Sequence, residues 1–332
     1  MKSKQTLLGF GALFAAIALL PWLGVYPIFA MKVMCYALFA CAFNLLIGFT
    51  GLLSFGHAAF LGVAAYACGH ALKVWGLPTP LGLLVGVGAA ALMGLVFGLL
   101  AIRRAGIYFA MITLALAQML YFVFLQASFT GGEDGLQSVP RGSLLGLDLS
   151  SDLHLYYLVL ALFAFGVWLI YRTVHSPFGQ VLTSIRENEA RATSLGYDVS
   201  QFKLLAFVLS AALAGLAGAT KTLVLGFATL SDALWTTSGL VILMTLVGGM
   251  GTMTGPMVGA LVIVALEDKI GDLGKALADA SGIDWFNGLG ESVSLVTGLI
   301  FIACVLLFRR GVVGELGALW EKMRKTPDKL RA

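Results

Sequence analysis

The chain has 332 residues, of which 59% are hydrophobic and 11% are charged, with a formal net charge of +4 at pH 7. An average soluble domain carries about 25% charged and roughly 45–50% apolar residues, so this composition excludes a water-soluble globule. Lipid accepts apolar side chains but leaves no backbone group unpaired, so spanning segments are helical and need roughly 20 apolar residues each. We therefore expect an all-α, polytopic transmembrane bundle that forms a single domain over residues 1–332.

About ten apolar runs follow one another along the chain, and each predicts a membrane-spanning helix. The first run follows Lys2 and Lys4, as a signal peptide would. However, Pro21, Trp22 and Tyr26 stand where a cleavage site needs small residues, so we expect a retained span. The runs are 7–27, 30–49, 51–72, 80–102, 106–127, 153–171, 203–225, 236–250, 255–267 and 290–308.

The basic residues predict the orientation of these spans. If the N-terminus is cytoplasmic and the spans alternate, 15 of the 21 Lys and Arg residues fall on the cytoplasmic side, as the positive-inside rule favours. Both termini are then cytoplasmic, with a long loop at 172–202 and a basic tail at 309–332. Of the 17 acidic residues, 11 fall outside, including Glu133 and Asp134. They favour a basic docking surface on a partner, although a solvated turn explains this acidic pair equally well.

Two glycine-rich breaks, 48–57 and 247–256, interrupt the apolar pattern. Non-helical backbone at membrane depth survives only where it is buried in protein or lines a wet cavity, and paired interruptions in a transporter often mark the substrate site. Both breaks fall on the cytoplasmic side of the predicted topology, which does not fit an inverted repeat. Two tight helix–helix turns explain the breaks equally well.

The loop 172–202 contains the most informative pattern. The segment 176–179 (Ser-Pro-Phe-Gly) predicts a turn, and 180–195 predicts one short amphipathic helix that stops at Gly196. Its apolar face would hold Ile185, Ala192 and Leu195, while Glu187 and Arg191 form a favourable i,i+4 pair on the charged face. Such a helix suits the transmission of motion to an ATPase on another chain. An ordinary solvated helix fits the pattern equally well.

This loop closely resembles that of the LivM-type permeases of branched-chain amino acid ABC importers, and the likeness continues in order over most of the chain. It also covers the segments 51–60, 106–115, 130–136, 203–218 and 248–256. Glu189-Ala190-Arg191 corresponds to the Glu-Ala-Ala coupling segment, with Arg191 in place of an Ala and Gly196 one position later than the usual Gly. The resemblance implies that coupling to the ATPase involves Arg186, Glu187, Asn188, Glu189, Ala190, Arg191 and Gly196.

The resemblance also implies the setting of the chain. We expect a permease subunit in the bacterial inner membrane that pairs with a second, homologous permease, with two cytoplasmic ATPase subunits and with a periplasmic substrate-binding protein. ATP and Mg would bind the ATPase subunits, so no cofactor, no catalytic residue and no nucleic acid are expected on this chain. The expected cargo is leucine, isoleucine and valine, or related small polar substrates such as urea or amides.

Five polar residues within otherwise apolar spans are candidates for the substrate pathway: Asn44, Ser54, His57, Thr113 and Gln118. Polar groups in lipid are costly unless paired, and they usually face the bundle interior. They predict either a weakly polar path for a zwitterion or interhelical hydrogen bonds worth about 0.6 kcal/mol each. Two further polar residues lie nearer the surface, where we expect Lys221 to extend to the outer surface and His70 to be interfacial.

Two alternative functions remain open on the residues alone. A secondary transporter driven by an ion gradient usually needs carboxylates within its spans, and the middles of these spans contain almost none. An intramembrane protease needs a Ser–His or Asp–Asp pair, and Ser54 and His57 lie too close in sequence to provide one. The cysteines, Cys35, Cys41, Cys68 and Cys304, all lie in apolar runs and lack the spacing of disulfide or zinc sites.

Overall fold

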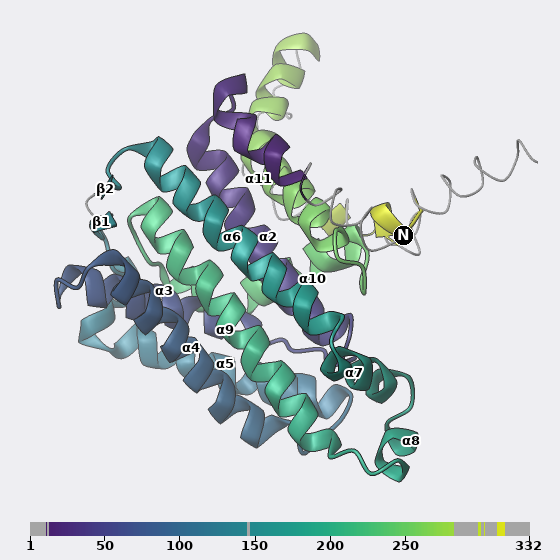
Figure 1. Cartoon of the computed structure of the whole chain (residues 1–332). Coiled ribbons are helices and arrows are strands. Elements are labelled where there is room, and N and C mark those ends of the chain that lie inside the picture. Colours follow the sequence, from purple (N-terminus) through teal and green to yellow (C-terminus); the bar gives the residue numbers. More distant parts are fainter. Residues whose placement is uncertain are drawn as a thin grey trace, which may run out of the picture.

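The chain forms a bundle of long apolar helices. The structure, a computed structural model, describes residues 11, 13–144, 147–281, 298, 299, 302 and 311–315. Figure 1 shows the long helices running together from the end of the molecule that carries β1 and β2 to the end that carries α7 and α8. The prediction of an all-α, polytopic bundle is confirmed, since the only strands in the described part are a hairpin of two short ones.

The elements follow the apolar runs in order. A short helix over residues 13–19 continues into η1 (Leu20–Leu23). The other elements are α2 (Pro27–Ile47), α3 (His57–Lys73), α4 (Thr79–Ala101), α5 (Ile107–Gln126), η2 (Ser128–Thr130), η3 (Gly132–Asp134), β1 (Ser143–Leu144), β2 (Leu147–Asp148), α6 (Asp152–Val174), α7 (Pro177–Glu187), α8 (Glu189–Ser194), α9 (Val199–Leu225), η4 (Leu230–Ala233), α10 (Trp235–Gly248) and α11 (Gly255–Ser281).

Among the described residues, five helices are long and apolar enough to cross a membrane: α2, α4, α5, α6 and α9. Two predicted boundaries differ most from the observed ones. The span predicted at 51–72 becomes helical only at His57, and the segment predicted to be loop from 268 is helical to Ser281. The run 236–250, already short for a span, gives a helix of 14 residues. The predicted span 290–308 and most of the tail lie outside the described residues, so the count of ten spans stays a prediction.

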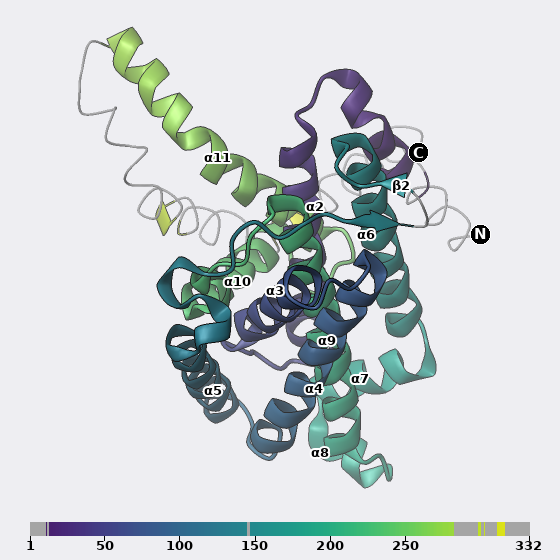
Figure 2. The same cartoon turned by 90° about the vertical axis from the view of Figure 1, so that its left-hand side faces the viewer.

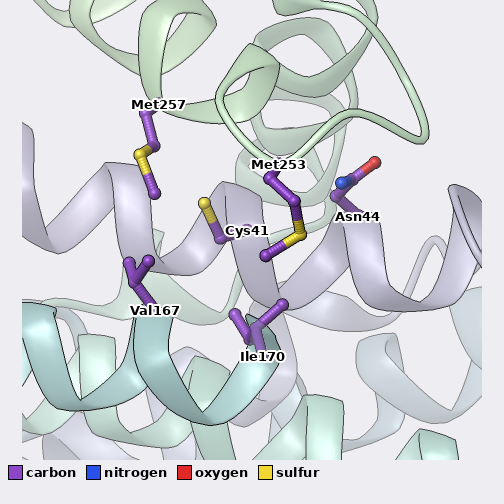
Figure 3. Close-up of a pocket in the computed structure, with 6 residues that line it drawn as sticks. All are labelled: Cys41, Asn44, Val167, Ile170, Met253 and Met257. Carbon is purple, nitrogen blue, oxygen red and sulfur yellow. The ribbon is translucent and has the colours of Figure 1, made fainter. Parts of the chain in front are cut away.

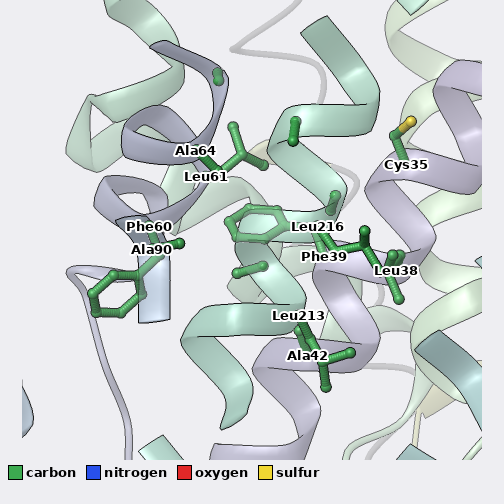
Figure 4. Packing of buried hydrophobic residues seen from close by; sticks show 14 of the residues in the cluster. Cys35, Leu38, Phe39, Ala42, Phe60, Leu61, Ala64, Ala90, Leu213 and Leu216 are labelled. Carbon is green, nitrogen blue, oxygen red and sulfur yellow. The ribbon is translucent and has the colours of Figure 1, made fainter. Parts of the chain in front are cut away.

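Helix α9 lies at the centre of the bundle and packs against α2, α3 and α4. Figure 4 shows Phe39 and Leu38 of α2 beside Leu213 and Leu216 of α9 in the buried core. At Gly218 the backbones of α9 and α3 approach so closely that a Cβ would lie 2.9 Å from the Leu61 carbonyl carbon. Small residues permit such contacts between membrane helices, where packing rather than hydrophobicity drives association.

Helix α10 is short because the chain before it re-enters the bundle. Ala228 exchanges two backbone hydrogen bonds with Leu136, and η4 then packs against the middle of α3, where a Cβ on Gly62 would lie 2.7 Å from the Ala233 Cβ. The Ser238 hydroxyl accepts a hydrogen bond of 2.9 Å from the backbone N–H of Ala58. Helix α10 therefore begins beside the first turns of α3 rather than at the end of the bundle.

Candidate functional site

The loop 172–202 folds into two short helices, where one was predicted over 180–195. The Ser176 hydroxyl accepts a hydrogen bond from the Gly179 N–H, so Ser-Pro-Phe-Gly begins α7 rather than forming a turn before it. Asn188 has extended backbone and ends α7, and its side chain caps α8 by accepting a hydrogen bond of 3.0 Å from the Arg191 N–H. Glu187 and Arg191 consequently lie on different helices, and the predicted i,i+4 pair is wrong.

The two helices pack on the beginning of α9. Ile185 of α7 and Ala192 of α8 are buried in a small cluster with Val199 of α9, as predicted for the apolar face. Leu195 was predicted to join them but is 70% exposed, because the chain leaves the helix there and turns at Gly196, whose φ of +89° suits glycine. The residues predicted to couple to the ATPase, 186–191, are all exposed. Their arrangement leaves a polar surface open to another protein.

An ion pair fixes α8 to α9. The Glu189 carboxylate lies 2.7 Å from the Lys203 ammonium, which is almost fully buried while the glutamate side chain is half exposed. A buried ammonium is costly without an acceptor, so Glu189 satisfies Lys203 as well as presenting a charge at the surface. The candidate coupling residue is therefore also part of the attachment of the loop to a long membrane helix.

Arg186 connects the last turn of α7 to the first glycine-rich break. Its guanidinium donates a hydrogen bond to the Gly48 carbonyl at the end of α2. Its aliphatic part lies against Gly51, where a Cβ would be 3.2 Å from the Arg186 Cγ, and Gly51 has a φ of +76°. Gly51 thus provides both the space and the left-handed backbone that this contact requires. The exposed loop and the first break are in direct contact.

Asn44 connects the first break to the second. In the last turn of α2, its side-chain amide donates a hydrogen bond of 2.8 Å to the Thr252 carbonyl and accepts one of 2.9 Å from the Gly251 N–H. Asn44 is 2% exposed. Figure 3 shows Asn44 beside Met253, with Cys41 on the same helix. The space enclosed by the residues around it has no room for a water molecule, so Asn44 acts here as a clamp between two segments rather than as the wall of an open path.

The two breaks and α7 therefore form one unit, which we call the junction: Asn44, Gly48, Gly51, Arg186, Gly251 and Thr252. The sequence predicted only that both breaks lie on the cytoplasmic side, without a contact between them. The structure adds that Asn44 and Arg186, predicted for two different roles, belong to this same unit. A displacement of α7 would pull on the end of α2, and through Asn44 on the turn that joins α10 to α11.

The other pathway candidates are not brought together with Asn44. His57 is fully buried, and its Nε2 lies 3.1 Å from the hydroxyl of Ser210, which donates to the Ala42 carbonyl. The imidazole is surrounded by the rings of Phe39, Phe43 and Phe60, with centroids 5.4–5.8 Å away. His57 thus forms an interhelical hydrogen bond through Nε2, while its Nδ1 is buried without a hydrogen-bond partner in the described structure. Its pathway role stays a prediction.

Thr113, Ser54 and Gln118 differ in how their polar atoms are satisfied. The Thr113 hydroxyl donates to the Ala110 carbonyl of its own helix at 2.9 Å. Ser54 Oγ and Gln118 Nε2 are buried without a hydrogen-bond partner in the described structure. Such atoms can bind a polar ligand more readily than a satisfied threonine can. The pathway role of these two residues stays a prediction.

A buried ion pair within the bundle was not predicted from the sequence. Lys221 of α9, predicted to reach the outer surface, is 7% exposed and pairs with Asp232 of η4, which is 4% exposed. Its ammonium also lies 5.5 Å from the centre of the Tyr36 ring, within the range of a cation–π contact. Two opposite charges only 11 positions apart, in a chain with few charges, were the available signal.

The sequence of residues 26–307 matches the protein family described as "Branched-chain amino acid transport system / permease component". The chain belongs to this permease family. The LivM permease protein of the high-affinity branched-chain amino acid transport system is 28% identical in Salmonella typhimurium and 27% identical in Escherichia coli; each match covers 74% of this chain and 64% of the relative. The permease protein LsrC of the autoinducer 2 import system of Klebsiella pneumoniae subsp. pneumoniae is 31% identical over 42% of this chain and 41% of that protein. The chain thus spans just under two thirds of the length of its LivM relatives.

The membrane permease also presents an acidic turn at the end opposite α7 and α8. Glu133 and Asp134 are exposed in η3, and Leu136, two residues later, is hydrogen bonded to Ala228 before η4. The turn is thereby attached to the re-entrant segment beside α3. Its use as a docking surface for a basic partner stays a prediction.

The Glu189–Lys203 ion pair allows a direct test of whether the loop 172–202 couples to the ATPase. We expect Glu189→Lys to leave the chain inserted but to lower uptake roughly tenfold, within the range of typical coupling free energies, because it places a second ammonium beside the buried Lys203. Uptake and ATP hydrolysis by the assembled transporter would be measured together. Gln180→Lys, which also adds a positive charge at an exposed position of α7 but lies outside the predicted coupling residues, is the control. Normal uptake by Glu189→Lys would contradict a coupling role for the residue.

Proposed function

We propose that the chain is the permease subunit of an ATP-driven importer in the bacterial inner membrane, with both termini cytoplasmic. It forms half of a translocation pathway, and a second, homologous permease forms the other half. Two cytoplasmic ATPase subunits bind ATP and Mg, a periplasmic binding protein delivers the substrate, and this chain itself needs no cofactor. The substrates are leucine, isoleucine and valine, or related small polar molecules such as urea or amides.

The junction is the observation that carries this proposal. An ATPase on another chain can drive transport only if its motion reaches the segments that cross the membrane. Residues 186–191 offer an exposed polar surface, and Arg186 and Asn44 connect that surface to both breaks through three hydrogen-bonded contacts. The relatives named as permeases of branched-chain amino acid and autoinducer 2 systems support the transport of small polar cargo.

The structure does not favour the secondary transporter. Such a transporter needs a carboxylate that can bind and release its ion within the membrane. Asp232 is a buried carboxylate, but it is already paired with Lys221 and hydrogen bonded to the Thr229 N–H at 3.4 Å. Its charge is therefore neutralised by the chain itself.

The test is a mild-detergent purification of the tagged chain from its native host, with mass spectrometry of every protein that co-purifies. We expect a second permease and ATPase subunits, and uptake into reconstituted vesicles that requires ATP and the binding protein. Uptake that survives ATP depletion but collapses with an ionophore would overturn the proposal, as would recovery of this chain alone under conditions that preserve other ABC complexes.

A further inference from the structure

A groove of about 330 Å³ lies between α3, α4 and α5, towards the end of the bundle opposite α7 and α8. It exists because α4 packs closely along α3, whereas α4 and α5 meet only briefly. Figure 2 shows these three helices beside one another. Its walls are apolar at membrane depth, with Val85 and Met93 on α4 and Leu120 and Phe124 on α5.

Two polar atoms in the wall of this groove have no partner. Tyr66 Oη and His70 Nδ1 are buried without a hydrogen bond in the described structure, and Tyr66 is only 3% exposed. Because they are four residues apart on α3, both side chains lie on the same face of the helix. A buried donor left unsatisfied is costly, and lipid chains offer it no acceptor. An acceptor on a bound ligand would satisfy both groups.

The dimensions of the groove fit one acyl chain of a phospholipid. From the start of α4 at Thr79 to Met93 the helix rises roughly 20 Å, and one leaflet of the hydrocarbon core is about 15 Å thick. His70 lies roughly 5 Å from the end of α3 at Lys73, near the depth at which the ester carbonyls of a lipid lie. The mouth carries Trp75 and Phe129, both exposed, with ring centroids 5.5 and 6.1 Å from that of His70, and aromatic residues of this kind favour the membrane interface.

We propose that this groove is a phospholipid site. One acyl chain lies along α4 and α5, and its ester carbonyl accepts hydrogen bonds from Tyr66 Oη–H and from a His70 ring N–H. The proposal requires only that the helices span a bilayer, so it stands or falls independently of the transported substrate.

A second groove on the same molecule provides an internal comparison. It encloses about 420 Å³ between α4, α6 and α9, and its lining, which includes Leu83, Leu162 and Ala212, is entirely apolar. An acyl chain can enter either groove, but only the first offers hydrogen-bond donors. The first should therefore retain a lipid through purification, while the second should exchange with detergent.

Native mass spectrometry of the full chain in its assembled complex would test the site, with palmitoyl-oleoyl phosphatidylethanolamine titrated after delipidation. We expect Tyr66→Phe to weaken retention of this lipid roughly three- to tenfold, as the loss of one neutral hydrogen bond predicts. His70→Phe should act similarly while keeping an aromatic ring against Trp75 and Phe129. Ala67→Phe, which fills the groove, should abolish retention, and Ala212→Phe in the second groove should not.

Two results would overturn the proposal. The first is unchanged retention in Tyr66→Phe, a substitution small enough to leave folding intact even where Ala67→Phe does not. The second concerns a protein occupant. If Ala67→Cys in the assembled complex cross-links to the partner permease and is shielded from a bilayer-dissolved maleimide, a helix of the partner fills the groove instead of a lipid.

Discussion

Replacing Lys221 by methionine is expected to cost roughly 3–5 kcal/mol of folding free energy, because it leaves the Asp232 carboxylate buried without its partner. The double variant Lys221→Met/Asp232→Leu has no charge to bury. Replacement of a buried ion pair by apolar residues of similar volume is often neutral or stabilising by about 1–4 kcal/mol. We therefore expect the double variant to be as stable as the unsubstituted chain, although it carries two substitutions and the less stable variant carries one.

The cysteines of the chain provide the measurement. Cys35, Cys41 and Cys68 are free and buried, so a thiol-reactive dye added during heating reports their exposure as the bundle unfolds. At roughly 2–4 °C per kcal/mol, the single variant should unfold about 10 °C earlier. Lys73→Met is the control, since Lys73 is exposed and, within the part of the chain that the structure describes, donates to the Gln137 carbonyl alone.

The same pair of variants separates stability from transport. If the ion pair only holds η4 against α9, the folded double variant imports substrate normally, and this is the result we expect. A double variant that is as unstable as Lys221→Met would contradict the argument from charge burial. A stable double variant without uptake would instead place Lys221 and Asp232 on the substrate's route.

Hydropathy predicted the long helices well because their boundaries coincide with the ends of apolar runs. The runs 80–102 and 106–127 became α4 (Thr79–Ala101) and α5 (Ile107–Gln126) within one residue at each end. Hydropathy failed at α3, where residues 51–56 are mostly apolar but not helical. Their backbone is held by Arg186 and by the packing around Gly51 and Gly56, and a single-sequence profile contains no information on such contacts.

The break between α7 and α8 could have been predicted from the residue type at position 188, but the amphipathic pattern over 180–195 favoured one continuous helix. Asn is a poor residue for the interior of a helix and a strong one at its N-cap, and Asn188 is followed at once by the acidic Glu189. The junction had no such signal. Asn44 and Thr252 are 208 positions apart, and an isolated asparagine in an apolar run predicts a buried hydrogen bond without identifying its partner.

Asn44→Leu is expected to abolish most uptake while leaving an inserted and assembled protein. Leucine has the same branched shape as asparagine but leaves the Gly251 N–H and the Thr252 carbonyl without their partner, at a cost of about 1–3 kcal/mol for each buried group. The turn between α10 and α11 then separates from α2 without disturbing the central packing of α9. Asn44→Asp keeps an acceptor for Gly251 but loses the donor to Thr252. Its uptake should therefore lie between that of the unsubstituted chain and that of Asn44→Leu.

Uptake and thermal stability of single and double variants distinguish a clamp that transmits movement from a hydrogen bond that only stabilises the fold. If Asn44 transmits the movement of α7, then Asn44→Leu and Arg186→Ala interrupt the same chain of contacts, and the double variant should lose no more uptake than the more severe single variant. Independent stabilising contacts would instead give losses that multiply, with thermal unfolding shifts that add. ATP hydrolysis should be measured alongside uptake. If Asn44→Leu breaks the clamp, the assembled ATPase still hydrolyses ATP but substrate is not imported. If the variant misfolds, the permease does not assemble with the ATPase.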